Sequence, residues 1–319
     1  MLYTRRELGK LALTALPAAG MLLKSDATYA GVQTAKPNSK WAGVQVGMNV
    51  PYNFGNNNMS GDEVLARCLQ LGISGVELRS QPVELFLGSP AMITGAPKPS
   101  AAELRKWRVS VPMSKVQEFR KTYEDAGVAI EIVKYDGILG FTDDVLDYSF
   151  ELARTLGASA ISCELPPAQV TEAKRLGVFA DKHQMMIGFH GHTLMTPALW
   201  EQAFTYAKFN GANLDLGHFV GGNKTSPVPF LKQHHDRITH IHVKDKTLKD
   251  VNVEFGTGDT PIKEALQVIR DNKWKIQATI EFEIPGPAGA DGRPRQWTMD
   301  ERMAEMARCV QYCKDCLLG

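Results

Sequence analysis

MMIGFH at residues 185–190, ANLD at 212–215 and ITHIHV at 238–243 are three short β-like runs that decide the fold. The segments between them, 197–209 and 228–236, show the apolar spacing of helices. Strands that alternate with helices in this way predict a parallel sheet with crossover helices. Each of the three runs also ends in or next to an ionisable residue.

The same alternation extends in both directions from this central stretch. Five further strands are expected at 44–50, 75–79, 128–133, 160–164 and 276–281, and six further helices at 60–71, 114–126, 143–156, 168–183, 261–271 and 299–318. Eight βα units over roughly 280 residues match a closed (β/α)₈ (TIM) barrel of the α/β class. A doubly wound sheet is the rival architecture, but Gly47 and Gly55 do not make the Gly-rich turn that follows its first strand.

The barrel domain is expected to occupy residues 43–319, with one interruption. The Pro- and Gly-rich segment 81–112 breaks the regular alternation, and we expect it to form a long loop over one end of the barrel. Long loops in such positions often contribute to binding or catalysis.

The N-terminus has the pattern of an export signal. Arg5 and Arg6 precede a mildly apolar stretch, 11–23, which is too short to span a bilayer. Small residues and a plausible cleavage site at 27–30 follow. We interpret residues 1–30 as a twin-arginine-type signal peptide and 31–42 as a linker, which predicts a periplasmic or secreted protein. The alternative is an amphipathic start to a cytosolic protein.

The composition excludes several classes of protein. Of the 319 residues, 44% are hydrophobic and 22% charged, as in soluble globular proteins, which argues against disorder and against stable membrane insertion. The net charge of +1 gives no basic field for nucleic acid, and this also argues against a nuclease of the related repair barrels. A small, weakly charged substrate fits better. An outer helix or the last helix could support a homo-oligomer.

The five cysteines do not define a disulfide scaffold or a structural zinc site. Cys309, Cys313 and Cys316 fall on one face of the last predicted helix, without the second pair of ligands that structural zinc requires. We interpret them as packing or surface thiols.

Ionisable residues gather at the ends of the last five predicted strands, where the active sites of such barrels lie. In chain order they are Glu164, His190, His192, Asp215, His218, His240, His242, Lys244, Glu281 and Glu283. One histidine at a strand end is usually a hydrogen-bonded core residue, but this does not explain ionisable residues at the ends of five consecutive strands. Several carboxylates in a desolvated cup repel one another unless a divalent cation joins them. Mixed carboxylate and imidazole ligands suit Mn, Co, Zn, Fe or Ni.

At this point the sequence resembles the xylose-isomerase-like barrels, the sugar phosphate isomerase/epimerase superfamily, over roughly residues 43–310. The most specific segments are GFHGH at 188–192, LDLGH at 214–218, HIHVKD at 240–245, FGTG at 255–258 and IEFE at 280–283. The resemblance implies one divalent metal held by Asp215, His242 and Glu281. The fourth ligand is open, since His190 stands where many relatives have Glu; Glu164 is slightly preferred, with His190 as ligand or substrate contact.

The chemistry expected of this site is removal of a proton next to a carbonyl, through an enediolate. The candidate catalytic residues are His190, Glu164, Glu283 and Lys244. His192, His218 and His240 are expected to contact a small-molecule sugar, and His192 is also a candidate base.

Reprotonation of the enediolate gives isomerisation or epimerisation, whereas loss of a neighbouring substituent gives elimination. Export favours a non-phosphorylated sugar or polyol. A lyase acting on 3-keto-glycosides and a non-catalytic metal-dependent carbohydrate-binding protein are the two alternatives.

Overall fold

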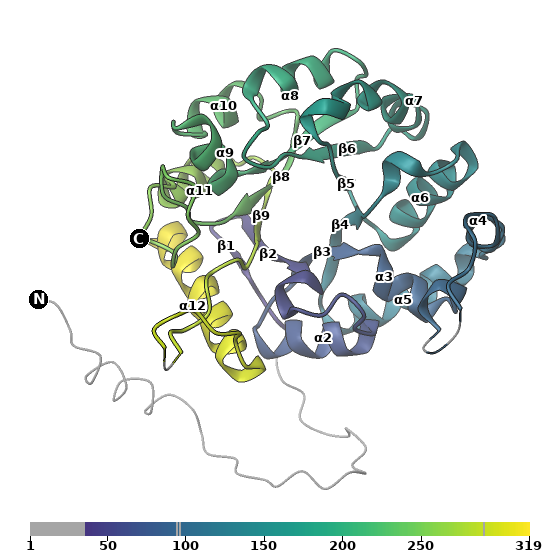
Figure 1. Ribbon diagram of the computed structural model, residues 1–319, viewed down its shortest axis with the longest axis horizontal. Coiled ribbons are helices and arrows are strands. Elements are labelled where there is room, and N and C mark those ends of the chain that lie inside the picture. The colour runs from purple at the N-terminus through teal and green to yellow at the C-terminus, as the bar shows by residue number, and fades with distance from the viewer. Residues whose placement is uncertain (1–35, 94, 96, 290) are drawn as a thin grey trace, which may run out of the picture. The chain divides into compact units, whose positions relative to one another are not determined.

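The computed structural model describes residues 36–319 except 94, 96 and 290. Eight parallel strands close into a barrel (Figure 1). They are β2 (Val44–Val50), β3 (Gly75–Arg79), β4 (Ala129–Tyr135), β5 (Ala160–Glu164), β6 (Met186–His190), β7 (Asn210–Asp215), β8 (Ile238–Val243) and β9 (Gln277–Ile280). Each strand pairs with the next, and β9 pairs with β2 to close the ring. The predicted (β/α)₈ barrel is therefore confirmed, while the predicted signal 1–30 lies outside the described residues.

Helices surround the barrel on all sides (Figure 1). They are α2 (Gly61–Gln70), α3 (Ser80–Phe86), α4 (Ala101–Arg108), α5 (Met113–Ala126), α6 (Asp143–Leu156), α7 (Ala173–His183), α8 (Pro197–Phe204), α9 (Leu216–Asn223), α10 (Val228–Gln233), α11 (Ile262–Asp271) and α12 (Met299–Leu318). The first and last of these begin at capping boxes, in which Ser60 and Thr298 accept from the backbone N–H three residues on. None of the helices in the described part of the chain is long and apolar enough to cross a membrane.

The segment 81–112 is not the long loop that was predicted. It contains α3, a short 3₁₀ helix (Pro90–Met92) and α4. A capping box at Ser100 and Glu103 starts α4, and a bidentate ion pair between Arg108 and the buried Glu84 ties α4 to α3. Local caps and one ion pair thus give helical structure to a segment whose Pro and Gly content indicates a loop.

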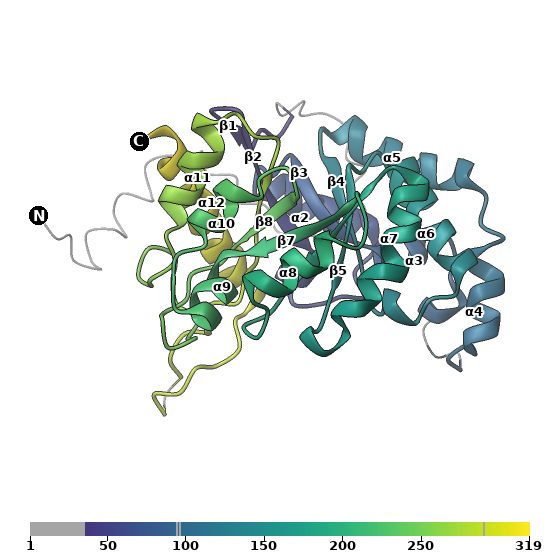
Figure 2. The same ribbon diagram turned by 90° about the horizontal axis from the view of Figure 1, so that it is seen from above.

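The barrel fold begins before residue 43. The short strand β1 (Lys40–Trp41) pairs antiparallel with the start of β2, inside the segment predicted to be a linker. The buried Ser39 hydroxyl donates to the Val46 carbonyl. These residues therefore lie at the end of the barrel opposite to the carboxyl ends of its strands. At the other end, the segment between β9 and α12 extends away from the barrel (Figure 2).

The core lies between the strands and the helices. All five cysteines are buried and free, and Cys309, Cys313 and Cys316 face the barrel from α12. The interpretation of these three residues as packing thiols agrees with this burial.

Gly188 tests how tightly the interior of the barrel is packed. A Cβ at this position would lie 2.1 Å from Thr239 Oγ1 and 3.2 Å from the Asn213 nitrogen. We expect Gly188→Ala to destabilise the fold by about 1–3 kcal/mol through overpacking. Gly140→Ala is the matched control, since a Cβ there meets nothing within 4 Å. Thermal unfolding of both variants checks this, and equal midpoints would contradict it.

Candidate metal and active site

The carboxyl ends of the strands bring the predicted residues to one rim of the barrel. The pairing sets Glu164 beside His190 on β5 and β6, and Asp215 beside His242 on β7 and β8. Glu281 follows β9, and its backbone N–H donates to the Val243 carbonyl of β8. Parallel pairing alone is therefore enough to place these side chains around one axis.

Asp215, His242 and Glu281 converge on one buried point. His242 Nδ1 lies 3.4 Å from Glu281 Oε2 and 3.8 Å from Asp215 Oδ2. Among the described residues, His242 Nδ1 makes no hydrogen bond of good geometry, and the ammonium nearest to Asp215 Oδ2 is that of Lys244, at 3.2 Å. Ligands that bind one divalent ion at about 2.1 Å lie roughly 3.4 Å apart in a tetrahedral site. The three predicted ligands thus fit a shared divalent cation.

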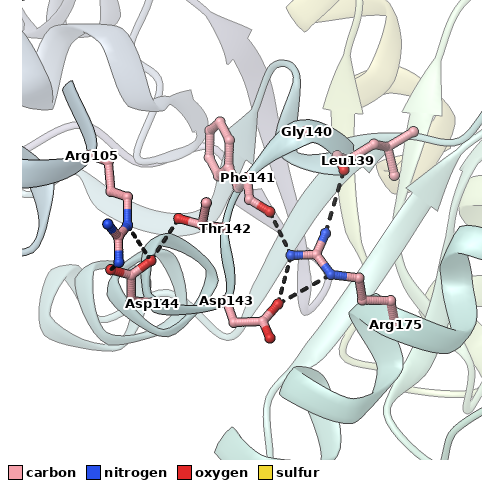
Figure 3. A pocket seen from close by; sticks show the side chains of 8 residues that line it. All are labelled: Arg105, Leu139, Gly140, Phe141, Thr142, Asp143, Asp144 and Arg175. Carbon is pink, nitrogen blue, oxygen red and sulfur yellow. Dashed lines mark hydrogen bonds and ion pairs between the residues drawn. The ribbon is translucent and has the colours of Figure 1, made fainter. Parts of the chain in front are cut away.

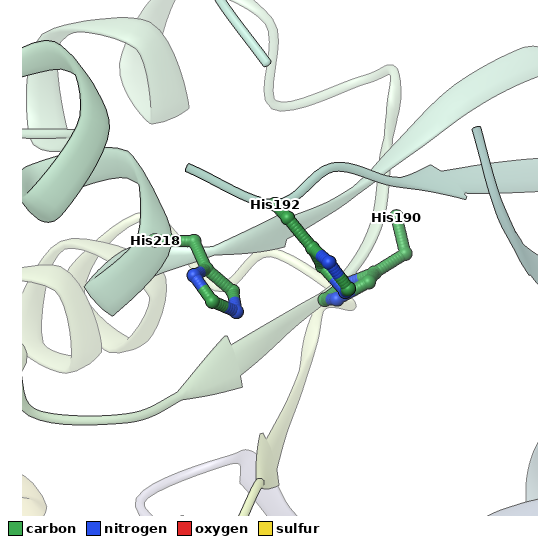
Figure 4. A group of neighbouring side chains, drawn as sticks. All are labelled: His190, His192 and His218. Atoms are coloured by element: carbon green, nitrogen blue, oxygen red, sulfur yellow. The ribbon is translucent and has the colours of Figure 1, made fainter. Parts of the chain in front are cut away.

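The fourth ligand position is better matched by histidine than by Glu164. His190 and His218 each offer a nitrogen that lies, with Asp215 and Glu281 oxygens, in one group within 4.8 Å. Figure 4 shows the rings of His190, His192 and His218 close together above the strand ends. Burial and the nearby Lys134 charge hold the pKa of His190 well below its usual range, so its ring is neutral and able to ligate.

Glu164 lies beside this group, not within it. Its Oε1 pairs with Lys134 Nζ at 2.8 Å, and its Oε2 lies 3.1 Å from His192 Nε2 and 4.0 Å from His190 Nε2. Although burial opposes the charge, the contacts with His190, His192 and Lys134 lower the pKa of Glu164 below its usual range. The geometry therefore does not favour the predicted ligand role of Glu164 and leaves it as an ionised group at the mouth.

Lys244 places an ammonium group among three carboxylates. Its Nζ lies 2.7 Å from Glu281 Oε2, 3.2 Å from Asp215 Oδ2 and 2.8 Å from Glu283 Oε2. Burial would lower the pKa of Lys244, but Asp215, Glu281 and Glu283 hold it well above its usual range. Lys244 is therefore a fixed positive charge, which suits stabilisation of negative charge and not proton abstraction.

Glu77, on β3, is a central residue that the sequence analysis missed. It is fully buried, and its Oε2 lies 2.6 Å from His242 Nε2 while its Oε1 lies 3.3 Å from His240 Nε2. Burial would raise the pKa of Glu77, but His242 and His240 hold it well below its usual range. The carboxylate fixes the His242 ring so that its Nδ1 faces Asp215 and Glu281. His240 lies one layer deeper than His242, so its predicted contact with substrate is not favoured.

Three further polar residues at the rim were also missed. Asn49 Nδ2 donates to Glu281 Oε1 at 3.0 Å, and the Tyr52 hydroxyl donates to Glu283 Oε1 at 2.8 Å. Lys134, only 1% exposed, pairs with Glu164. For Glu77, the sequence did contain a signal: alternation along the β3 sequence GVELR puts Glu77 and Arg79 on the same, inward face of the strand.

A hollow of 620 Å³ lies apart from the strand ends. It is bounded by Arg105, residues 139–144 and Arg175 (Figure 3). Both of its arginines are already paired, Arg105 with Asp144 and Arg175 with Asp143. It contains none of the converging histidines and carboxylates, so we place the candidate site at the barrel mouth.

The barrel is similar to several solved structures, among them xylose isomerase domain proteins and sugar epimerases. A xylose isomerase domain protein from Planctomyces limnophilus matches with a TM-score of 0.57 at 12% identity, over 88% of this chain and 98% of that chain. The chain has the xylose-isomerase-like barrel fold. A 3-keto-D-glucoside 4-epimerase from E. coli matches with a TM-score of 0.52 at 13% identity, over 85% and 99% of the two chains. A D-psicose 3-epimerase matches with a TM-score of 0.56 at 12% identity, over 86% of this chain and 100% of that chain.

Neither a family model nor a curated protein matches the sequence. The resemblance to xylose-isomerase-like barrels that the motifs predicted is confirmed at the level of fold. At these identities, the activities of the neighbours remain statements about the neighbours.

Glu77→Gln removes a buried charge with little change of shape. We expect the metal-free variant to lose about 1–3 kcal/mol of stability near pH 6, because His242 and His240 lose their charged partner. The folded pKa of Glu77 lies below its unfolded value of about 4.3, so this stabilisation is present above that pH and disappears as the pH falls through the folded value.

Urea denaturation at pH 6 and pH 3 measures the difference. Glu118→Gln, which breaks only an exposed pair with Lys115, should stay within about 0.5 kcal/mol of the wild type at both values. A Glu77→Gln deficit as large at pH 3 as at pH 6 would contradict the assignment.

Proposed function

We propose that the chain is a divalent-metal-dependent sugar isomerase or epimerase that removes a proton next to a carbonyl. The observation that carries this proposal is the convergence of Asp215 Oδ2, His242 Nδ1 and Glu281 Oε2 on one buried point. The sugar isomerases and epimerases among the structural neighbours support the same general kind of enzyme. The chemistry that a bound divalent cation supplies is Lewis-acid stabilisation of negative charge on the substrate's carbonyl and hydroxyl oxygens.

We assign proton transfer to two carboxylates, Glu164 and Glu283, which lie on opposite sides of the mouth. Glu164 ends β5 and Glu283 follows β9, and these two strands are four positions apart in the closed ring of eight. Lys134 and His192 hold Glu164, while Tyr52 and Lys244 hold Glu283. One carboxylate takes the carbon-bound proton, which yields the enediolate form of the sugar. Inversion needs the opposite carboxylate to carry a proton when the substrate binds: it gives that proton to the other face of the carbon and ends ionised, while the base ends protonated. This placement favours epimerisation.

The remaining residues hold the substrate and stabilise charge. Lys244 provides a fixed ammonium beside Glu283, close to where the enediolate oxygens develop negative charge. His190 is neutral and buried, and it completes the ligand set or contacts a hydroxyl group. His192 is exposed at the mouth and accessible to substrate.

A non-phosphorylated substrate fits the charges at the mouth. Its buried cations already have carboxylate partners: Lys134 with Glu164, Arg79 with Asp136, Lys244 with Glu281 and Lys246 with Asp250. A phosphate group is usually bound by cations that are free to pair with it. The predicted export signal favours the same class of substrate. We propose that the protein acts in the periplasm or outside the cell. The 3-keto-glucoside neighbour suggests an oxidised glycoside as one such substrate.

The proposed metal site is tested by measuring Mn²⁺ binding to variants with one residue replaced. Asp215→Ala and Glu281→Ala should each weaken Mn²⁺ affinity by more than about 100-fold, because each removes a ligand. Glu283→Gln is the matched control and should bind as the wild type does. Lys244→Gln should bind more tightly, because an ammonium no longer competes for the same two oxygens.

Metal content by mass spectrometry and affinity by calorimetry measure these effects. Full retention of metal in both Asp215→Ala and Glu281→Ala would mean that the ion binds elsewhere.

Proton exchange tests the proposed reaction. Metal-loaded wild-type protein in deuterated water should incorporate deuterium next to the carbonyl of D-fructose or of a 3-keto-glucoside, as followed by proton NMR. Glu164→Gln and Glu283→Gln should each slow exchange about 10²–10⁴-fold. Glu151→Gln, an exposed change on α6, should not.

The products of this experiment separate the alternatives. An epimer supports the proposal, while an unsaturated product with release of the aglycone identifies the lyase. Sugar binding with no exchange on either probe identifies a carbohydrate-binding protein and rejects the enzymatic function.

A further inference from the structure

Arg79 lies at the mouth between the two carboxylates assigned to proton transfer, and the proposed reaction does not use it. Its paired residue on β4 is Lys134, which contacts Glu164. On the other side, the Arg79 guanidinium lies over the ring of Tyr52, 4.8 Å from its centroid, and the Tyr52 hydroxyl donates to Glu283. Because β3 lies opposite β7 in the ring of strands, a substrate whose carbonyl faces the candidate metal ligands has its other end toward Arg79.

Only one nitrogen of the Arg79 guanidinium is engaged by the protein. Nη1 donates to the two carboxylate oxygens of Asp136, at 2.9 and 2.7 Å. Nε and Nη2 make no hydrogen bond with any described residue, although the side chain is only 9% exposed. Buried donors without a partner are costly, so native proteins normally supply one from the chain, from water or from a ligand. The two unused nitrogens of Arg79 donate side by side, in the geometry that fits two neighbouring oxygens.

Gln81 and Asp136 provide acceptors beside these donors. Gln81 Nε2 donates to Asp136 Oδ2 at 2.8 Å, while Gln81 Oε1 is buried and has no partner among the described residues. The Asp136 side chain is 38% exposed, so this group of three side chains extends from the buried guanidinium to solvent at the rim. Gln81 is also the first residue of the segment 81–112, which the sequence analysis associated with binding.

The charges of the three side chains determine which ligand they fit. Asp136 neutralises Arg79, so an anionic ligand would meet the carboxylate and a cationic one the guanidinium. An apolar ligand would remove water from the unpaired donors of Arg79 and the unpaired oxygen of Gln81 without replacing its hydrogen bonds. Neighbouring hydroxyl groups both donate and accept. They are uncharged and match the unpaired atoms.

We propose that Arg79, Gln81 and Asp136 form a specificity-determining subsite for hydroxyl groups in the part of the substrate away from the reacting carbonyl. Such hydroxyl groups are present in the tail of a free ketose and in the second sugar of a glycoside. This assignment rests on the proposed function, because that function places the carbonyl opposite Arg79.

The test uses two 3-keto-glucosides that differ in the aglycone. One carries a glucosyl group, and the other carries a cyclohexyl group, a ring of similar size without hydroxyls. D-Fructose is the third ligand. Calorimetry of the Mn²⁺-loaded full chain gives the dissociation constants, and deuterium exchange into each ligand is followed by proton NMR.

The proteins compared are the wild type, Arg79→Met, Gln81→Met and the control Arg105→Met. Gln81→Met keeps the buried pair between Arg79 and Asp136, so it tests the subsite without disturbing that pair. Arg105→Met breaks an exposed pair with Asp144 outside the mouth.

The wild type should bind the glucosyl form at least about tenfold more tightly than the cyclohexyl form, because the latter leaves buried donors and an acceptor unpaired. Arg79→Met and Gln81→Met should each reduce this preference to within about threefold, and Arg105→Met should retain it. Equal binding of the two glucosides, with D-fructose weakened about tenfold in both subsite variants, supports the subsite and assigns it to the tail of the ketose.

Two results overturn the subsite. One is a wild-type preference for the cyclohexyl form, and the other is unchanged affinity for all three ligands in both Arg79→Met and Gln81→Met. If the wild type exchanges deuterium while these affinities are unchanged, the proposed function stands and the subsite fails. If the two variants lose affinity but the wild type exchanges no deuterium, the subsite stands and the enzymatic function fails.

Discussion

The structure depends on the compensation of negative charge on carboxylates that are buried inside the barrel. Glu77, Asp215 and Glu281 are at most 4% exposed, and an isolated carboxylate at such a depth would be strongly destabilising. Each is compensated by groups that arrive from other strands. Glu77 is paired with histidines of β8, and Asp215 and Glu281 share Lys244 and the Nδ1 side of His242. The fold and the site are thus stabilised by the same contacts, and the ring of strands must close for these contacts to form.

The order and type of the main elements follow from short-range patterns. Apolar runs of four to seven residues between amphipathic helices predict eight strands and a barrel, and the strands lie within a few residues of the expected bounds. The segment 81–112 was misjudged because its Pro and Gly content is a local signal for a loop. Its two helices depend on a cap at Ser100 and on the ion pair between Arg108 and Glu84, which joins residues far apart in the chain.

The candidate site could be predicted from the sequence where its residues lie at the ends of strands. The proximity of Asp215, His242 and Glu281 could be predicted because parallel strands carry their last residues to one rim. Glu77 was missed because it contacts His242 from across the barrel, 165 residues away in the chain, and no sequence spacing reports that contact. The choice between Glu164 and His190 also depended on an unnoticed residue. Lys134 engages one oxygen of Glu164, and His190 lies nearer to Asp215 and Glu281.

The His242 side and the His218 side of the candidate site are held by different contacts. This difference determines which side can be altered by substitutions in the loops. His242 is held from inside the barrel by Glu77, a contact that no rim loop can alter. His218 is held from outside by Thr193 and Asp250, which belong to the loops after β6 and β8. Loops tolerate substitution better than barrel strands do. The candidate metal-binding side is therefore constrained by the core, while the orientation of His218 depends on residues of two loops.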